Sequence, residues 1–212
     1  VASNSGTLVK SGFTFAGWNT SADGLGTSVA ENAANFTTTS NVTLYAKWSA
    51  ASYSVTYSTD GGSAAPTQSN TAYGSTFTLP SAPTKSGFDF LGWQLNSNNY
   101  AAGSTFTMSD TSITFTAQWS GVYYAITYAL NGGAGATPTQ ADVASGGSFT
   151  SAAAPTRSGY DFDGWSDGVD TVTATTAVTN VSSNKTLTAQ WKIAKPGTPG
   201  IPTVVPGSGS AT

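Results

Sequence analysis

The chain has 212 residues, of which only 8% are charged, and its formal net charge is −3. That balance excludes the basic surface on which nucleic-acid binding depends. It contains no His and no Cys, which removes the commonest general base, two common metal ligands and all thiol chemistry, so we expect no cofactor, no metal and no catalysis. No run of about 18 apolar residues occurs, so we also expect no membrane span.

A nine-residue phrase first appears at residues 10–18 as KSGFTFAGW, and it returns at 85–93 and 157–165. Its glycine-containing start is typical of a turn, and the rest is typical of a short strand. Phe88 and Phe90 are two residues apart and should share one face of that strand. Trp93 would then point the other way, so we expect a bulge at Gly92 that returns the indole to the core.

Tryptophans mark a period of about 72 residues along the whole chain. Trp18, Trp93 and Trp165 end the three phrases, and a second series, Trp48, Trp119 and Trp191, closes each copy. Such a period indicates a tandem array of small structural units. We predict an incomplete module at 1–50 that lacks its first strand, complete modules at 51–119 and 120–191, and a Pro/Gly-rich linker at 192–212. Because the chain does not begin with Met, we expect it to be a fragment or a processed piece.

Each complete copy opens and closes with an alternating apolar segment. Residues 53–58 and 124–130 open the second and third copies, and residues 113–119 close the second. Valine and threonine dominate where helices would favour Leu, Glu and Lys, so we predict four or five short strands per module and little or no helix. The predicted core consists of Trp18, Trp48, Trp93, Trp119, Trp165, Trp191, Phe88, Phe90, Phe115, Tyr53, Val55, Tyr57, Tyr124, Ile126 and Tyr128.

These residues resemble the internalin-type B-repeat, also called the Listeria–Bacteroides repeat. The shared pattern runs from Tyr-x-Val-Thr-Tyr through Gly-Gly and Pro-Thr-Lys-Ser-Gly-Phe-x-Phe-x-Gly-Trp to Leu-Tyr-Ala-Lys-Trp. The resemblance implies small β-grasp-like modules strung in tandem on bacterial secreted or surface proteins. It does not imply an enzyme, and it carries over no ligand or binding residue.

Two sharper interpretations of single residue types compete with this architectural one. The Trp rings could be platforms on which sugars stack, but strand alternation favours a place in the core. Asp161, Asp163, Asp167 and Asp170 could hold Ca²⁺, but their spacing fits no EF-hand loop, which favours a solvated acidic loop.

We therefore expect a monomeric, non-catalytic stalk or spacer, outside a bacterial cell or at its envelope. The alternative is an adhesive array that binds a protein or glycan through the variable loops after Trp18, Trp93 and Trp165, because loops on a rigid scaffold often carry binding functions. An exposed Tyr100 would favour the adhesive array, and purely polar loops would favour the spacer.

Overall fold

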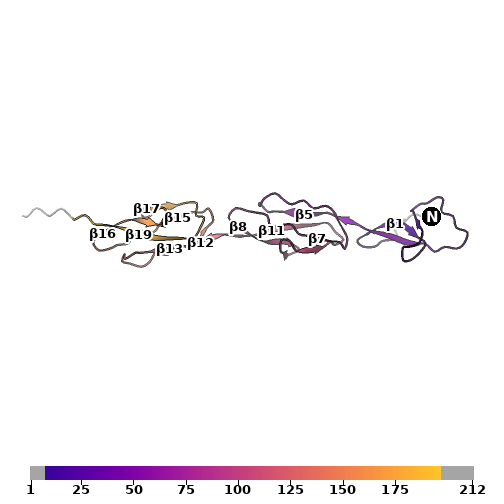
Figure 1. Cartoon of the computed structure of the whole chain (residues 1–212), viewed down its shortest axis with the longest axis horizontal. Coiled ribbons are helices and arrows are strands. Elements are labelled where there is room, and N and C mark those ends of the chain that lie inside the picture. Colours follow the sequence, from indigo (N-terminus) through magenta and orange to yellow (C-terminus); the bar gives the residue numbers. More distant parts are fainter. Residues whose placement is uncertain (1–7, 197–212) are drawn as a thin grey trace, which may run out of the picture. The chain divides into compact units, whose positions relative to one another are not determined.

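The computed structural model describes residues 8–196, and every regular element in that range is a β-strand (Figure 1). The prediction of a mainly β chain is therefore confirmed. The second and third copies contain eight strands each rather than the predicted four or five, because short pairs of two or three residues accompany the main sheets. Residues 1–7 of the first module and most of the expected linker, 197–212, lie outside the described residues. We refer to the copies that end at Trp48, Trp119 and Trp191 as repeats 1, 2 and 3. By its contacts the chain divides into two compact units, Val1–Val122 and Tyr123–Thr212.

Repeat 2 is built on a four-stranded mixed sheet, in which the strands that come first and last along the chain are parallel neighbours. In spatial order the strands are β5 (Val55–Ser58), β11 (Ile113–Gly121), β8 (Phe88–Leu95) and β9 (Asn98–Tyr100). Only the β5–β11 pair is parallel. Two small antiparallel pairs complete the repeat: β7 (Thr76–Thr78) with β10 (Thr105–Thr107), and β4 (Ser52–Tyr53) with β6 (Thr71–Ala72).

Repeat 3 has the same topology. Its main sheet orders β13 (Ile126–Ala129), β19 (Lys185–Ile193), β16 (Tyr160–Ser166) and β17 (Thr171–Val172), again with the first and last strands parallel. Its small pairs are β12 (Tyr123–Tyr124) with β14 (Val143–Ala144), and β15 (Phe149–Thr150) with β18 (Ala177–Val178).

Repeat 1 is smaller in its described part. Its sheet orders β2 (Ser28–Val29), β1 (Phe13–Asn19) and β3 (Tyr45–Ala50). The β1–β3 pair corresponds to β8–β11 and to β16–β19, but no described strand takes the place of β5 or β13. Among the described strands β3 therefore lies at an edge of its sheet, whereas β11 and β19 each lie between two neighbours.

A β-bulge turns the phrase tryptophan into the core, as expected. Phe90 pairs with Trp119 and Gly92 pairs with Gln118, so Leu91 is the extra residue, and Gly92 has φ +144°. The ladder shifts at the same place in the other two repeats. Without the extra residue Trp93 would face solvent, but its side chain is instead 0% exposed.

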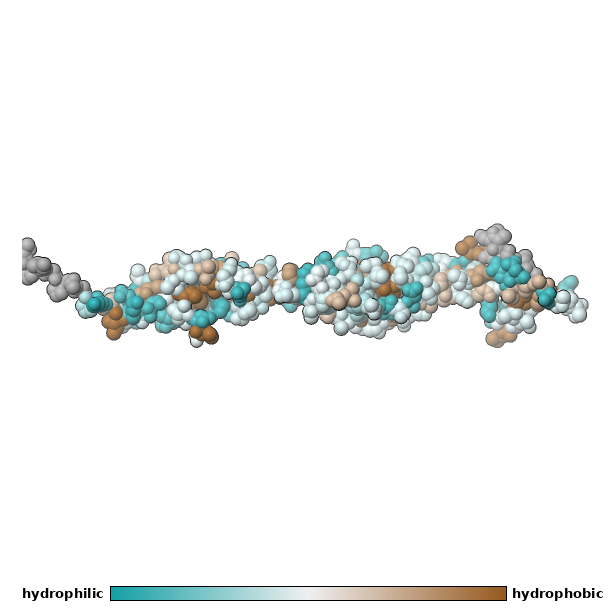
Figure 2. Space-filling model, turned by 90° about the horizontal axis from the view of Figure 1, so that it is seen from above, coloured by the Kyte–Doolittle hydropathy of each residue, from teal (hydrophilic) through white to brown (hydrophobic). Residues whose placement is uncertain are grey.

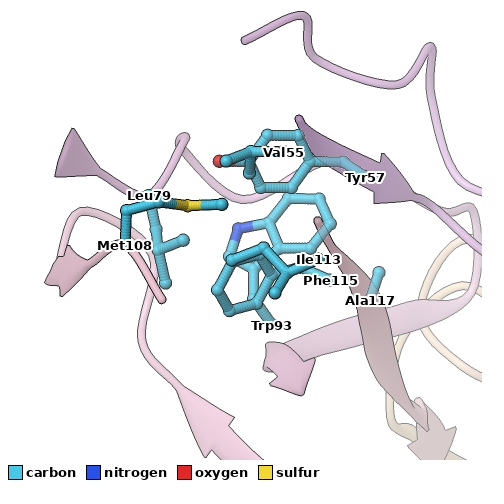
Figure 3. Close-up of a cluster of buried hydrophobic side chains, with 8 residues drawn as sticks. All are labelled: Val55, Tyr57, Leu79, Trp93, Met108, Ile113, Phe115 and Ala117. Carbon is cyan, nitrogen blue, oxygen red and sulfur yellow. The ribbon is translucent and has the colours of Figure 1, made fainter. Parts of the chain in front are cut away.

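The core of repeat 2 is an aromatic cluster around Trp93 (Figure 3). The Tyr57 ring packs edge-on against the indole at 5.0 Å and stacks on Phe115 at 5.8 Å. The indole Nε1–H of Trp93 donates to the Pro80 carbonyl at 3.1 Å, so its polar atom is satisfied inside the core. Leu79 and Met108 close the far side of the cluster, and Trp165 is the corresponding centre of repeat 3.

The predicted core residues fall into three classes of exposure. Buried are Trp93, Trp165, Phe115, Val55, Tyr57, Ile126 and Tyr128. Partly buried are Trp18, Trp48, Trp119, Trp191, Phe90, Tyr53 and Tyr124. Phe88 corrects the prediction, because its side chain is 43% exposed. It pairs with Gly121, beyond Trp119, and therefore lies past the end of the cluster, with the Lys85 ammonium 4.7 Å from its ring centre.

Candidate functional site: the repeat junction and the variable loops

The segment that joins repeats 1 and 2 is hydrogen-bonded on both sides. The Ala51 N–H donates to the Gly12 carbonyl at 2.9 Å, and the Tyr73 N–H donates to the Ala51 carbonyl at 2.8 Å. The Tyr73 ring meets Phe13 edge-on at 5.5 Å. It also covers Gly12, where an added Cβ would lie 2.3 Å from the ring. Glycine is therefore required here both for φ +77° and for the approach of the next repeat.

Part of this junction recurs at the end of every repeat. The Val122 N–H donates to the Gly87 carbonyl at 2.9 Å, and the Ala194 N–H donates to the Gly159 carbonyl at 3.0 Å. Each repeat thus fixes the residue that follows its last strand to the turn of its own phrase. Sequence reasoning missed this role of the Lys/Arg-Ser-Gly turn. The Gly that recurs directly before the first aromatic residue of each phrase was the available signal, because a repeated turn suggests a repeated contact.

A cation over an aromatic ring accompanies each of these turns. Lys10 lies 4.2 Å from the Phe13 ring centre, Lys85 lies 4.7 Å from that of Phe88, and Arg157 lies 4.1 Å from that of Tyr160. The apolar stems and charged heads shield rings that the sheet leaves exposed. The first letter of the phrase, Lys or Arg, therefore has a structural role.

The variable loops differ between the repeats in what they display. Leu25, after Trp18, is 87% exposed and Val169, after Trp165, is 89% exposed. Tyr100, after Trp93, is instead partly buried, with its ring 5.4 Å from Phe106 and 5.8 Å from Phe115. The aromatic residue whose exposure would have favoured binding thus belongs to the core edge. Over the face seen in Figure 2, apolar residues form small separate patches on a surface of mostly intermediate hydropathy.

Repeat 3 has a hollow of about 450 Å³ beside its variable loop, lined in part by Asp167, Asp170, Asn180 and Lys185. The Lys185 ammonium pairs with the Asp167 carboxylate. That ammonium, with the backbone N–H groups of Asp170 and Val169, holds the pKa of Asp167 well below its usual range. In repeat 2 the equivalent positions are Leu95 and Ile113. Ile113 belongs to the core, and Leu95 packs against it. The sequence signal was Lys185 itself, two residues before the buried Leu187.

Two of the four acidic residues considered for calcium are held in ion pairs. Asp163 pairs with Lys192 at 3.2 Å, and Asp167 pairs with Lys185. Among residues 8–196, no three His, Cys, Asp or Glu side chains lie together as a metal site. The same part of the chain contains no helix that could cross a membrane.

Comparison with known proteins places the chain in a family. The model of the Listeria–Bacteroides repeat domain matches residues 1–47, 53–118 and 124–190. The chain therefore belongs to the Listeria–Bacteroides repeat family and carries three tandem repeats, as the resemblance predicted.

Two relatives come from Evansella cellulosilytica. The chain is 34% identical over 190 residues to a protein named "Putative Gly-rich membrane protein", and 36% identical over 160 residues to a "Putative membrane protein". These alignments cover 88% and 74% of the chain but only 22% and 24% of the relatives, so the chain spans less than a quarter of their length. No solved structure matches the chain.

Proposed function

We propose that this chain is a non-catalytic spacer, a segment of a bacterial protein exposed outside the cell or at its envelope. Family membership supports a repeat segment, and the names of the two relatives support an association with the membrane. The sparse charge of the surface suits an exposed segment that avoids non-specific binding. We further propose that each complete repeat is a β-grasp-like module, because its first and last strands along the chain are parallel neighbours. We also propose that the chain works as a monomer.

The junction of repeats 1 and 2 is the observation that carries this proposal. Ala51 is hydrogen-bonded to both repeats, and Tyr73 packs across the joint onto Gly12 and Phe13. A flexible linker would instead leave its backbone to water. A spacer needs such a joint, because it must hold the parts that it separates at a fixed distance.

Pulsed electron spin measurements of distance test the joint. The chain has no Cys, so cysteines introduced at the exposed, equivalent positions Thr14 and Asp89 give two unique label sites. We expect a narrow distribution of distances in the parent chain. Tyr73→Ala should broaden it, because the ring that spans the joint is lost, whereas Tyr73→Phe should not. A distribution that is already broad in the parent chain would contradict a fixed joint. A narrow distribution that Tyr73→Ala leaves unchanged would contradict the role assigned to the Tyr73 ring.

One observation favours the adhesive alternative, namely the apolar tips of two variable loops, Leu25 and Val169. If these tips bind a partner, beads coated with the chain should be retained on a glycan array or on peptidoglycan fragments. The double variant Leu25→Ser, Val169→Ser should then lose that retention. Leu91→Ser is the matched control, because Leu91 is also exposed, at 56%, but lies on β8 outside the loops. Retention that both variants keep would speak against loop-mediated adhesion.

A further inference from the structure

The hollow of repeat 3 lies where repeat 2 has a cluster of three aromatic rings. In repeat 2 the rings of Tyr100, Phe106 and Phe115 meet edge-on, with centres 5.2–5.8 Å apart. Strand pairing assigns each ring a smaller, aliphatic counterpart in repeat 3: Val172 for Tyr100, Val178 for Phe106 and Leu187 for Phe115. The smaller side chains leave space beside Trp165, and all four residues line the hollow.

A charged pair borders the same space. Lys185 and Asp167 stand where repeat 2 has two apolar side chains, yet they are only 23% and 14% exposed. A charged pair held this far from solvent gives no more stability than a well-packed apolar pair, so packing alone does not account for it. The exchange instead gives the hollow a polar lining, in which each of the two charges neutralises the other.

Further polar side chains around the hollow bind nothing else within residues 8–196. They are the carboxylate of Asp170, the amide of Asn180 and the hydroxyl groups of Thr171, Thr179 and Ser182. The half-buried Val172 and Val178 supply an apolar wall. The volume of about 450 Å³ lies within the range of roughly 300–1,000 Å³ that is usual for small-molecule sites. A few polar groups that converge beside an apolar wall are also typical of such sites.

We infer that this hollow of repeat 3 is a binding site for one neutral sugar residue. A sugar ring presents neighbouring hydroxyl groups, each of which donates and accepts hydrogen bonds, and it has apolar C–H faces. The Asp170 carboxylate accepts from such hydroxyl groups, and the Asn180 amide both donates and accepts. The two valines of the wall can cover a C–H face. An anionic ligand fits less well, because Lys185 is already paired and the Asp170 carboxylate would repel it.

The backbone of the variable loop holds Asp170 in place. Its N–H donates to the Asp167 carboxylate at 2.9 Å, and its carbonyl accepts from the Ser166 hydroxyl at 2.9 Å. The free carboxylate of Asp170 is therefore positioned beside the hollow before a ligand arrives, which lowers the entropic cost of binding. Because aromatic rings occupy the same region of repeat 2, the site belongs to repeat 3 and repeat 2 is its internal control.

The test titrates the whole 212-residue chain, labelled with ¹⁵N, with glucose, galactose and N-acetylglucosamine. We expect at least one sugar to shift the amide resonances of residues 167–172 and 178–185 in a saturable way, with no shift in repeat 2. Asp170→Ala should weaken binding at least about tenfold, because a hydrogen bond to a charged group is lost. Asp161→Ala removes an exposed carboxylate of the same repeat that does not line the hollow, and it should bind like the parent chain.

A second variant refills the hollow. Val172→Tyr with Val178→Phe restores two of the three rings of repeat 2 and should abolish binding. The inference is overturned if no sugar binds, if repeat 2 shifts equally, or if either the Asp170→Ala variant or the refilled variant binds as tightly as the parent chain. Acetate or glycine that produces the same shifts would also overturn it, because the hollow would then bind ions.

The source of the sugar is distinguished by a matching trisaccharide. It binds as tightly as the monosaccharide if the ligand is the end of a glycan chain, and it fails to bind if the ligand is a free sugar. Either result supports a sugar site. The inference rests neither on the apolar loop tips nor on the spacer proposal, which is tested separately by the distances across the joint of repeats 1 and 2.

Discussion

Tyr57 and Tyr128 occupy equivalent places in repeats 2 and 3, but only one of them has a partner for its hydroxyl group. The Tyr128 hydroxyl accepts from the Ala152 N–H at 3.0 Å. The Tyr57 hydroxyl is buried and has no hydrogen-bond partner among residues 8–196. Pro80 explains the difference, because it stands where Ala152 stands: the carbonyls of both accept from the indole of their repeat, and proline has no N–H to donate.

Replacement of each tyrosine by phenylalanine should therefore affect the stability of the two repeats differently. Tyr128→Phe removes a made hydrogen bond and should destabilise repeat 3 by about 1 kcal/mol. Tyr57→Phe removes a buried hydroxyl without a partner and should leave repeat 2 unchanged or more stable. Hydrogen exchange measured repeat by repeat on the full chain gives both values, and each variant is the control for the other. Equal losses in the two repeats would contradict this explanation.

Asp167 should make repeat 3 sensitive to acid, because of the pKa shift of its carboxyl group. Its pKa is lowered in the folded chain, so ionisation stabilises the fold above the ordinary carboxyl pKa of about 3.9, and that stabilisation is lost as the pH falls. We expect repeat 3 to lose more stability than its Asp167→Asn variant between pH 5 and pH 2, by thermal unfolding or hydrogen exchange. Asp163→Asn is the matched control, because the Asp163–Lys192 pair is more than half exposed on both sides and should contribute little. A wild-type and an Asp167→Asn profile of the same shape would contradict the assignment.

Among the elements, the bulged strand is the one that the sequence predicted best. Gly92, Gly17 and Gly164 all have positive φ at the bulge, and the tryptophan after each of them turns inward to the core or to its edge. The prediction succeeded because alternation from Phe90 gave the wrong face for Trp93, and one extra residue was the simplest remedy. Alternation alone failed at Phe88, because it reports the face of a strand but not where the core ends along it. The Asp167–Lys185 pair also escaped prediction, since spacing along the chain does not show that a loop folds back over a strand end.

Gly164→Ala tests the bulge. An added Cβ would lie 2.9 Å from the Val172 backbone oxygen, and φ is +135°. Gly159→Ala is the comparison, because Gly159 also has a positive φ, +77°, but nothing lies within 4 Å of its added Cβ. We expect Gly164→Ala to destabilise repeat 3 clearly more than Gly159→Ala, by hydrogen exchange of β16 and β17. Equal costs would show that the close approach of β17 does not require glycine.

At the scale of the whole molecule, three copies of one scaffold differ in how their ends are held. In repeats 2 and 3 the first and last strands are parallel and directly paired. Tension applied along the chain pulls such strands in opposite directions along their own axes, so their hydrogen bonds are loaded together in shear. In repeat 1 no described strand pairs with β3 in this way. In the spacer that we propose, two of the three repeats should therefore resist tension.

Stretching the single molecule from its two ends tests this account most directly. We predict two unfolding steps at similar, high force, each releasing about 60 residues or roughly 20 nm of chain, from the segments enclosed by β5–β11 and β13–β19. Repeat 1 should yield at lower force. Smooth extension with no separate high-force steps, or three equal steps, would contradict the account.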